Sequence, residues 1–188
     1  MTNIPALSLT TAAVALIAAG VAYYNARATS ARSAFELART LYSDLTSQDV
    51  AASRSILEFY RRAPSRTGGQ TKEAIDHYFV LLWQFEKVYA GRESLVGQRT
   101  INGTGGAIAF LDRMIKWHVE EWSARWLDIR AKLEAHIDEV DDCHTLEAFC
   151  DLADSMRVGQ EHVPAIREVI QAARDSQVQT AGSTSSQD

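Results

Sequence analysis

The fold of this chain is decided by residues 107–140, which read AIAFLDRMIKWHVEEWSARWLDIRAKLEAHIDEV. Apolar side chains recur there every three or four residues, at Ile108, Leu111, Ile115, Val119, Trp122, Trp126, Ile129, Leu133, Ile137 and Val140. This period is that of one face of an α-helix. We therefore predict an all-α fold with one long central helix. A second apolar row of Phe110, Met114 and Trp117 indicates that neighbouring helices enclose its first half.

Two shorter helices are predicted on the N-terminal side of this stretch. A helix over 46–62 is indicated by Thr46 with Asp49 three residues later, a cap followed by an acidic first turn. A second helix is predicted to begin at Thr71 and to end at Gly91, because apolar residues recur between them at helical spacing. The segment 92–106 is polar and turn-rich, so we expect an exposed loop there.

The C-terminal side is also predicted to be helical. Apolar residues over 146–153 indicate one helix, a turn is expected near Gly159, and a last helix runs from Pro164 to about Gln177. These helices are expected to cover the second half of the central apolar row, and pairing of that row with a second copy of the chain is the alternative. The small polar residues of 179–188 predict a disordered tail, which leaves 27–178 as a helical bundle domain.

The N-terminal segment Ile4–Tyr24 reads IPALSLTTAAVALIAAGVAYY and carries no charge. As a helix it covers about 30 Å, the thickness of a bilayer's hydrocarbon core. We therefore predict a transmembrane signal anchor over residues 1–26 that continues as a helix to a break at Thr46–Ser47. A cleaved signal peptide and a core helix are the alternatives. A signal peptide normally begins with positive residues, and a core helix normally shows a polar face, whereas this segment has neither feature.

The charges that flank this segment predict its orientation. Arg27, Arg32 and Arg39 follow it and no basic residue precedes it, which predicts that the N-terminus lies outside and the C-terminal domain in the cytoplasm. Residues 27–66 carry a net charge of +3, with seven Arg against four acidic residues, and the remainder carries −8. The part nearest the membrane is thus expected to be attracted to anionic lipid.

The composition excludes several classes of protein. The chain has 188 residues, of which 46% are hydrophobic and 23% are charged, with a formal net charge of −5. This is a globular composition, and it lacks the clustered cations of a nucleic-acid-binding protein. Arg outnumbers Lys by 15 to 4, but the cations do not form a basic tract. We expect no nucleic-acid partner.

Candidate metal ligands are few. Cys143 and Cys150 are seven residues apart, about 10 Å along a helix, so they are predicted to be free thiols. His144 beside them lacks the paired short spacings of a zinc site. The His118–Glu121 pair has the reverse of the Glu-x-x-His order of di-iron bundles. We expect no metal or other cofactor.

One polar residue stands on a face that is otherwise apolar. Glu86 lies between Leu82 and Tyr89 on the predicted helix 71–91, and Arg54 on the preceding helix is the partner we expect for it. A half-buried structural ion pair explains this better than a catalytic acid does. No nucleophile lies in a Gly-x-Ser-x-Gly turn, and we predict that the protein is not an enzyme and has no catalytic residues.

Three stretches carry a resemblance: YSDLTSQDVAASRSILEFY (42–60), AIDHYFVLLWQFEKVY (74–89) and WHVEEWSARWLDIRAKL (117–133). In their order along the chain and in their pattern of residue types they resemble an uncharacterised family of bacterial single-pass membrane proteins that carry a small helical domain of unknown function. The resemblance implies this architecture and no activity.

The function predicted from the sequence is that of a membrane-anchored helical binding or scaffolding module. Its expected partners are the lipid bilayer and another protein of unknown identity. Two alternatives stay open: a periplasmic or secreted helical domain released by cleavage, and a membrane-tethered enzyme.

Overall fold

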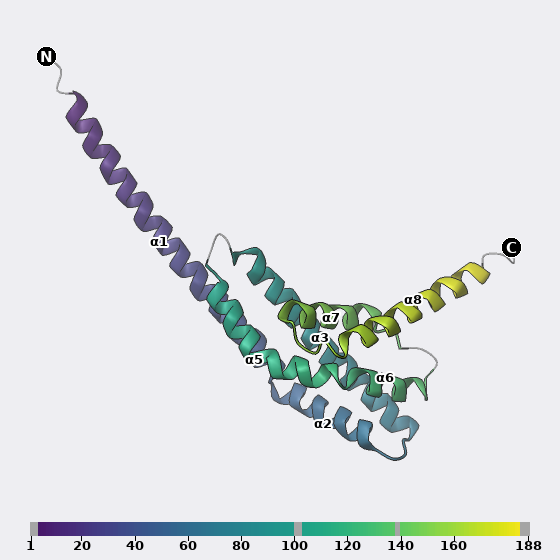
Figure 1. Ribbon diagram of the computed structural model, residues 1–188. Coiled ribbons are helices and arrows are strands. Elements are labelled where there is room, and N and C mark those ends of the chain that lie inside the picture. Colours follow the sequence, from purple (N-terminus) through teal and green to yellow (C-terminus); the bar gives the residue numbers. More distant parts are fainter. Residues whose placement is uncertain (1–3, 100–102, 138–139, 185–188) are drawn as a thin grey trace.

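The computed structural model describes the backbone of residues 4–99, 103–137 and 140–184, and the side chains of 11–99, 103–137 and 140–176. The described residues form an all-α bundle of seven helices (Figure 1). These are α1 (Ile4–Leu45), α2 (Gln48–Arg62), α3 (Gly68–Gly97), α5 (Gly105–Ser123), α6 (Trp126–Glu134), α7 (Cys143–Met156) and α8 (Val163–Thr184). The predicted all-α fold is confirmed.

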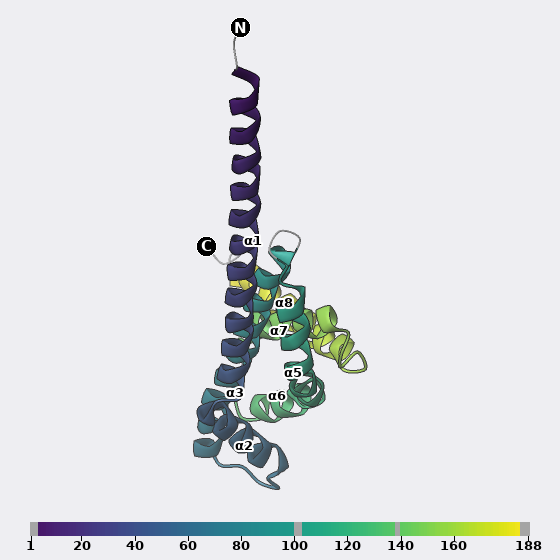
Figure 2. The same cartoon turned by 90° about the vertical axis from the view of Figure 1, so that its left-hand side faces the viewer.

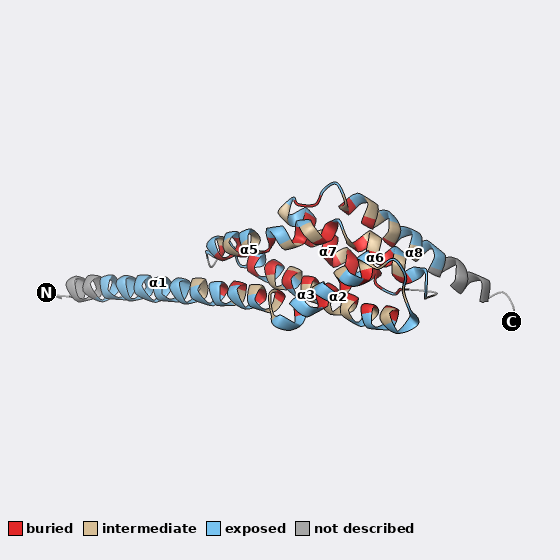
Figure 3. Ribbon diagram, turned by 90° about the horizontal axis from the view of Figure 1, so that it is seen from below, coloured by how far each residue is buried: buried red, intermediate tan, exposed pale blue. Residues whose placement is uncertain are grey.

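Helix α1 has two halves with opposite surroundings. Its first half projects away from the bundle as a straight stem (Figure 2), and every described side chain from Thr11 to Thr29 is exposed. Its second half packs on α3 and α5 through small and aliphatic residues spaced three or four apart, namely Ala34, Ala38, Leu41 and Leu45. Figure 3 shows the change from exposed to buried along the helix. We call residues 4–29 the stem.

The predicted transmembrane helix finds no support among the described residues. None of the helices there combines the length and the apolar character needed to cross a membrane. The first part of the predicted span lies outside this search, because no side chain of residues 1–10 is described. The predicted helix break is confirmed, since α1 ends at Leu45.

The cap of α2 lies one residue after the predicted cap Thr46, and the cap of α3 lies four residues before the predicted cap Thr71. Ser47, and not Thr46, caps α2 by accepting a hydrogen bond from the Val50 amide. Helix α3 begins with a capping box, in which the Thr67 hydroxyl accepts from the Gln70 amide and the Gln70 side chain accepts from the Thr67 amide.

Gly91 does not end α3, and this prediction was wrong. A Cβ atom at Gly91 would lie 2.5 Å from Cδ1 of Leu41, so the glycine lets α1 and α3 approach closely. The helix continues to Gly97, with Arg92 and Leu95 buried. The predicted loop 92–106 is therefore short, and its residues 100–102 lie outside the described residues.

The predicted long helix is two helices. The chain bends at Ala124 and Arg125, between α5 and α6. There the Ser123 hydroxyl donates to the Glu120 carbonyl at 2.7 Å, and the Arg125 amide donates to the Trp122 carbonyl, three residues back. Both bend residues keep right-handed helical dihedral angles, so the apolar period continues across the bend and the sequence does not reveal it.

The core is centred on Trp126, at the start of α6. Its indole lies edge-on to the rings of Tyr78, Phe85 and Phe149, at centroid distances of 5.3, 6.1 and 5.6 Å. Trp126, Ile129 and Leu133 are fully buried, mainly by α2 and α3 and by Phe149 of α7. The central row is thus covered within the chain, but mostly by helices other than those we predicted.

The C-terminal helices follow the predicted order. Helix α7 ends at Met156, its C-cap Arg157 has a left-handed backbone (φ 57°), and Gly159 (φ 61°) forms the predicted turn before α8. Helix α8 continues to Thr184, so it includes the first part of the segment 179–188. Residues 185–188 lie outside the described residues.

Candidate functional site

An open cleft lies between α2 and α5 and has a volume of about 410 Å³. Its walls combine two guanidinium groups, two indoles, a carboxylate and a hydroxyl, from Arg54, Arg125, Trp117, Trp122, Glu58 and Ser55. We call it the α2–α5 cleft. Its volume is within the range typical of small-molecule sites.

Arg54 reaches this cleft from the middle of α2, and its partner is not Glu86. Its Nη2 donates to the carbonyl oxygen of Leu45 at 2.9 Å, at the C-terminus of α1. Its Nε is buried and has no hydrogen-bond partner among the described residues. Burial lowers the pKa of Arg54. The predicted Arg54–Glu86 ion pair is wrong, and no described carboxylate pairs with this guanidinium.

His118, on α5, is a second group near the cleft with a polar atom that lacks a hydrogen-bond partner among the described residues. Its Nδ1 is buried, and no described residue forms a hydrogen bond with it. Burial, assisted by the nearby charge of Arg54, lowers the pKa of His118 to about 4. The imidazole is therefore neutral at pH 7, and it adds no charge to the cleft.

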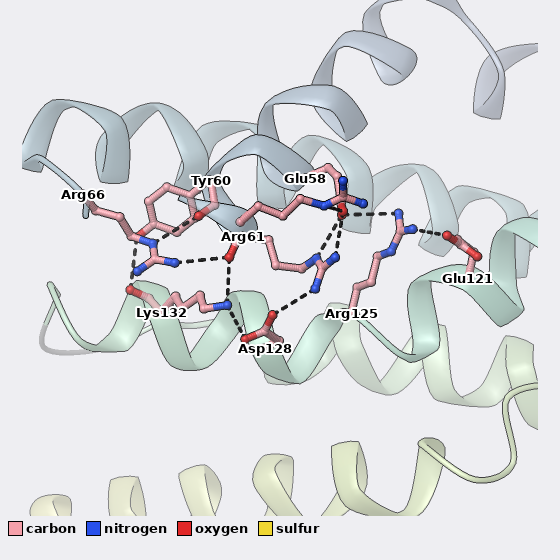
Figure 4. A network of polar contacts seen from close by, with 9 residues as sticks. Glu58, Tyr60, Arg61, Arg66, Glu121, Arg125, Asp128 and Lys132 are labelled. Atoms are coloured by element: carbon pink, nitrogen blue, oxygen red, sulfur yellow. Dashed lines mark hydrogen bonds and ion pairs between the residues drawn. The ribbon is translucent and has the colours of Figure 1, made fainter. Parts of the chain in front are cut away.

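Glu58, one turn after Arg54, is already shared by other cations (Figure 4). Arg61 donates to both of its carboxylate oxygens, at 3.0 and 2.7 Å, Arg62 pairs with it, and Nη1 of Arg125 lies 3.5 Å from Oε2. The hydrogen bond from Arg61 is the main cause that lowers the pKa of Glu58 to about 2. Glu58 therefore stays ionised, but it does not neutralise Arg54.

The same network joins α2 to α6. Arg61 also donates to Asp128 at 3.3 Å, and Lys132 donates to the Arg61 carbonyl oxygen at 2.9 Å. The Tyr60 hydroxyl donates to the Lys132 carbonyl oxygen at 3.0 Å. These contacts hold the C-terminal end of α2 against α6, next to the cleft.

The aromatic wall of the cleft comes from α5. Trp122 is buried, and the guanidinium of Arg125 lies 5.4 Å from its ring centroid. Trp117 is 61% exposed, so neighbouring helices do not enclose the second apolar row as predicted. Arg125 itself pairs with Glu121 as well as with Glu58. Arg54 is thus the cation in this cleft whose charge is unmatched.

A second polar cluster is closed to solvent. Asp142 is buried and accepts hydrogen bonds from the Tyr78 hydroxyl at 2.7 Å and from Arg130 Nε at 3.0 Å. Burial, followed by the charge of Asp142, raises the pKa of Tyr78 well above its ordinary value. Arg130 also pairs with Glu134. All three buried groups have partners, so this cluster stabilises the packing of α3 on α6.

Glu86 lies in a separate acidic groove between α3 and α7. The groove has a volume of about 310 Å³ and is lined by Tyr89, Ala90, Glu93, His144, Glu147, Ala148 and Asp151 in addition to Glu86. Oε1 of Glu86 lies 3.5 Å from Nδ1 of His144, and Glu147 and Asp151 pair with arginines of α8. Glu86 is therefore a rim residue of this groove.

The thiols and the possible metal ligands are placed as follows. Cys143 and Cys150 are free and buried, and burial raises the pKa of Cys150 to about 12. Glu121 pairs with Arg125 and not with His118. Over the described ranges, His, Cys, Asp and Glu side chains do not form a group of three or more that would hold a metal ion.

Sequence reasoning singled out Arg54 but did not find the cleft. The signal for it was Trp117, a large apolar residue that we assigned to an enclosed row. Comparison with protein families, curated proteins and solved structures finds no match for this chain. The resemblance to bacterial single-pass membrane proteins therefore stays a prediction.

Proposed function

We propose that this protein is a helical binding module held at a membrane by its stem. Residues 4–24 insert into a lipid bilayer, and the bundle of 27–178 stands on the cytosolic side. The observation that carries the proposal is the unbroken exposure of side chains over residues 11–29 of α1, apolar ones included, with Leu16 exposed by 75% and Ile17 by 67%. Exposed apolar surface of this extent is typical of a site that lipid or a partner covers.

The distribution of residues around the stem favours lipid as its cover. A helix that pairs with another helix carries an apolar stripe and a polar opposite face. The stem is uncharged on all sides as far as Ala26, and its polar residues there are few and small. Tyr23 and Tyr24, both exposed, precede Arg27, an order typical of a membrane–water boundary.

Membrane flotation tests the attachment. The full chain is expressed, membranes are floated on a density gradient, and the floated fraction is washed with carbonate. We expect the protein to float and to resist the wash. The double variant Leu16→Arg with Ile17→Arg is expected to remain at the bottom of the gradient, because charges at the centre of a span are costly.

The matched control adds the same charge to the bundle. Ala51→Arg with Ala109→Arg places two arginines at exposed positions of α2 and α5, and this variant should float like the wild type. A wild-type chain that stays soluble, or that carbonate extracts, would overturn the membrane proposal. The mass of the membrane-bound chain separates an intact anchor from a cleaved signal peptide.

The orientation has its own test. A reporter that is active only in the cytosol, fused after residue 188, is expected to work, and a periplasm-dependent reporter is not. Moving two arginines to positions 2 and 3 while replacing Arg27 and Arg32 by Ala should weaken or invert this preference. The opposite pair of reporter results would contradict the cytosolic placement.

A further inference from the structure

We propose that the α2–α5 cleft binds a small aromatic carboxylate, whose carboxylate pairs with Arg54 and whose ring lies against Trp117. The inference rests on the proposed function only in treating the bundle as the binding module. Membrane attachment does not enter it, because the cleft is lined by residues 54–125 alone.

The first argument is the unmatched charge of Arg54. A guanidinium that loses part of its hydration is costly unless an anion and hydrogen-bond acceptors replace the water. Arg54 has one described acceptor, the Leu45 carbonyl oxygen, and its Nε is buried without any. A carboxylate is the acceptor that matches a planar guanidinium best, since it accepts two parallel hydrogen bonds, here from the two Nη groups because Nε is closed to solvent.

The second argument is that the cleft cannot supply this anion itself. Its one carboxylate, Glu58, is held by Arg61, Arg62 and Arg125. The groups that line the cleft carry two positive charges against one negative charge. The neutral His118 leaves this balance unchanged. The electrostatics of the cleft therefore favour an anionic ligand.

The third argument concerns the body of the ligand. Trp117 is exposed beside Arg54, and its ring lies 5.0 Å from that of His118. Trp122, also on α5, and the guanidinium of Arg125 over its ring complete the aromatic and cationic lining. Flat apolar groups stack on such surfaces. About 410 Å³ accommodates one ring with a short acidic chain.

Arg54 also has a structural role, which the test must separate from binding. A cation at the C-terminus of α1 interacts favourably with the last carbonyl groups of that helix. Arg54→Lys keeps this charge and a donor for the Leu45 carbonyl oxygen, but it removes the planar pair of donors that a carboxylate contacts. This substitution therefore isolates the carboxylate contact while it keeps the support for α1.

The experiment is calorimetric titration of the full chain in a neutral detergent. The probes are 3-phenylpropionate, its uncharged amide and acetate, each corrected by titration into protein-free micelles. We expect 3-phenylpropionate to bind, and the amide and acetate to bind about tenfold more weakly or not at all, since each lacks one of the two contacts.

The variants locate the binding. Arg54→Lys and Trp117→Ala should each weaken binding of 3-phenylpropionate by about tenfold or more. Trp83→Ala and Arg113→Gln are the matched controls, an exposed tryptophan of α3 and an exposed arginine of α5 outside the cleft, and they should bind like the wild type. Trp117 is exposed, so its variant keeps the test valid if Arg54→Lys fails to fold.

A second readout responds only to an anion beside Arg54. Binding should raise the pKa of His118 from about 4, as followed by nuclear magnetic resonance of its ring, because the ligand's charge offsets that of Arg54. Failure of 3-phenylpropionate to bind at millimolar concentration overturns the proposal. Equal binding of the amide, or unchanged binding to both cleft variants, overturns it as well. None of these outcomes affects the flotation result.

Discussion

Replacing Arg130 by methionine tests the structural importance of the closed cluster. Asp142 is fully buried, the Arg130 side chain is 7% exposed, and the two groups meet at 3.0 Å. In Arg130→Met, Asp142 keeps its desolvation penalty with the Tyr78 hydroxyl as its one side-chain partner in the cluster. We expect the free energy of unfolding to fall by about 3–5 kcal/mol, the usual cost of breaking a buried pair from one side.

The assay is guanidinium unfolding followed by tryptophan fluorescence. Asp142→Asn should cost less than Arg130→Met, because Arg130 retains Glu134, whose side chain is 42% exposed. The double variant Arg130→Met with Asp142→Leu should recover much of the loss. Arg167→Met is the surface control and should cost under about 1 kcal/mol. A loss below about 1 kcal/mol for Arg130→Met would refute the reasoning.

Three further predictions concern pH and backbone strain. The pKa of His118 is about 4 in the folded chain and 6.5 in the unfolded chain, so the unfolded chain binds the proton first as the pH falls. The free energy of unfolding should therefore decrease from pH 6.5 to pH 4, and His118→Gln should flatten this decrease, as measured by denaturant midpoints. The pKa of Glu58 is about 2 in the folded chain and 4.5 in the unfolded chain, so its contribution to the free energy of unfolding is present above pH 4.5 and is lost as the pH falls towards 2. Glu58→Gln should abolish that loss in acid unfolding titrations. Gly159→Ala combines a positive φ with a Cβ 2.4 Å from the Ser123 hydroxyl oxygen and should cost about 1–3 kcal/mol in thermal unfolding, whereas Gly68→Ala meets open space and should cost less.

The sequence predicted what depends on local periodicity. Helical spacing located most of the helices, and the break after Leu45 and the end of α2 at Arg62 agree with the prediction. The sequence does not predict the bend at Ala124, because both bend residues keep helical dihedral angles and the apolar row continues through the bend in phase. The helix end predicted at Gly91 is wrong, because this glycine allows close packing against Leu41, which is a tertiary property.

The candidate site was less predictable than the fold. Arg54 and Glu86 were each recognised as unusual, but their partners depend on how α2 and α3 rotate relative to α5 and α7. Rotation about a helix axis is set by packing across the whole bundle, which one sequence does not encode in its spacing. The pairing of Arg130 with Asp142 has the same origin: Asp142 lies just before α7, beyond the end of α6.

The central claim, that the stem lies in lipid, is tested most directly by the solvent exposure of Ala18 in vesicles. A nitroxide spin label is attached to a cysteine at this exposed stem position, and a second label at Ser33, on the bundle side, serves as the reference. The native thiols Cys143 and Cys150 are buried, and burial raises the pKa of both, so they react slowly. The account predicts that the label at Ala18 collides with oxygen and is shielded from a water-soluble nickel complex, while the label at Ser33 shows the reverse. Equal access of the nickel complex to both labels would contradict it.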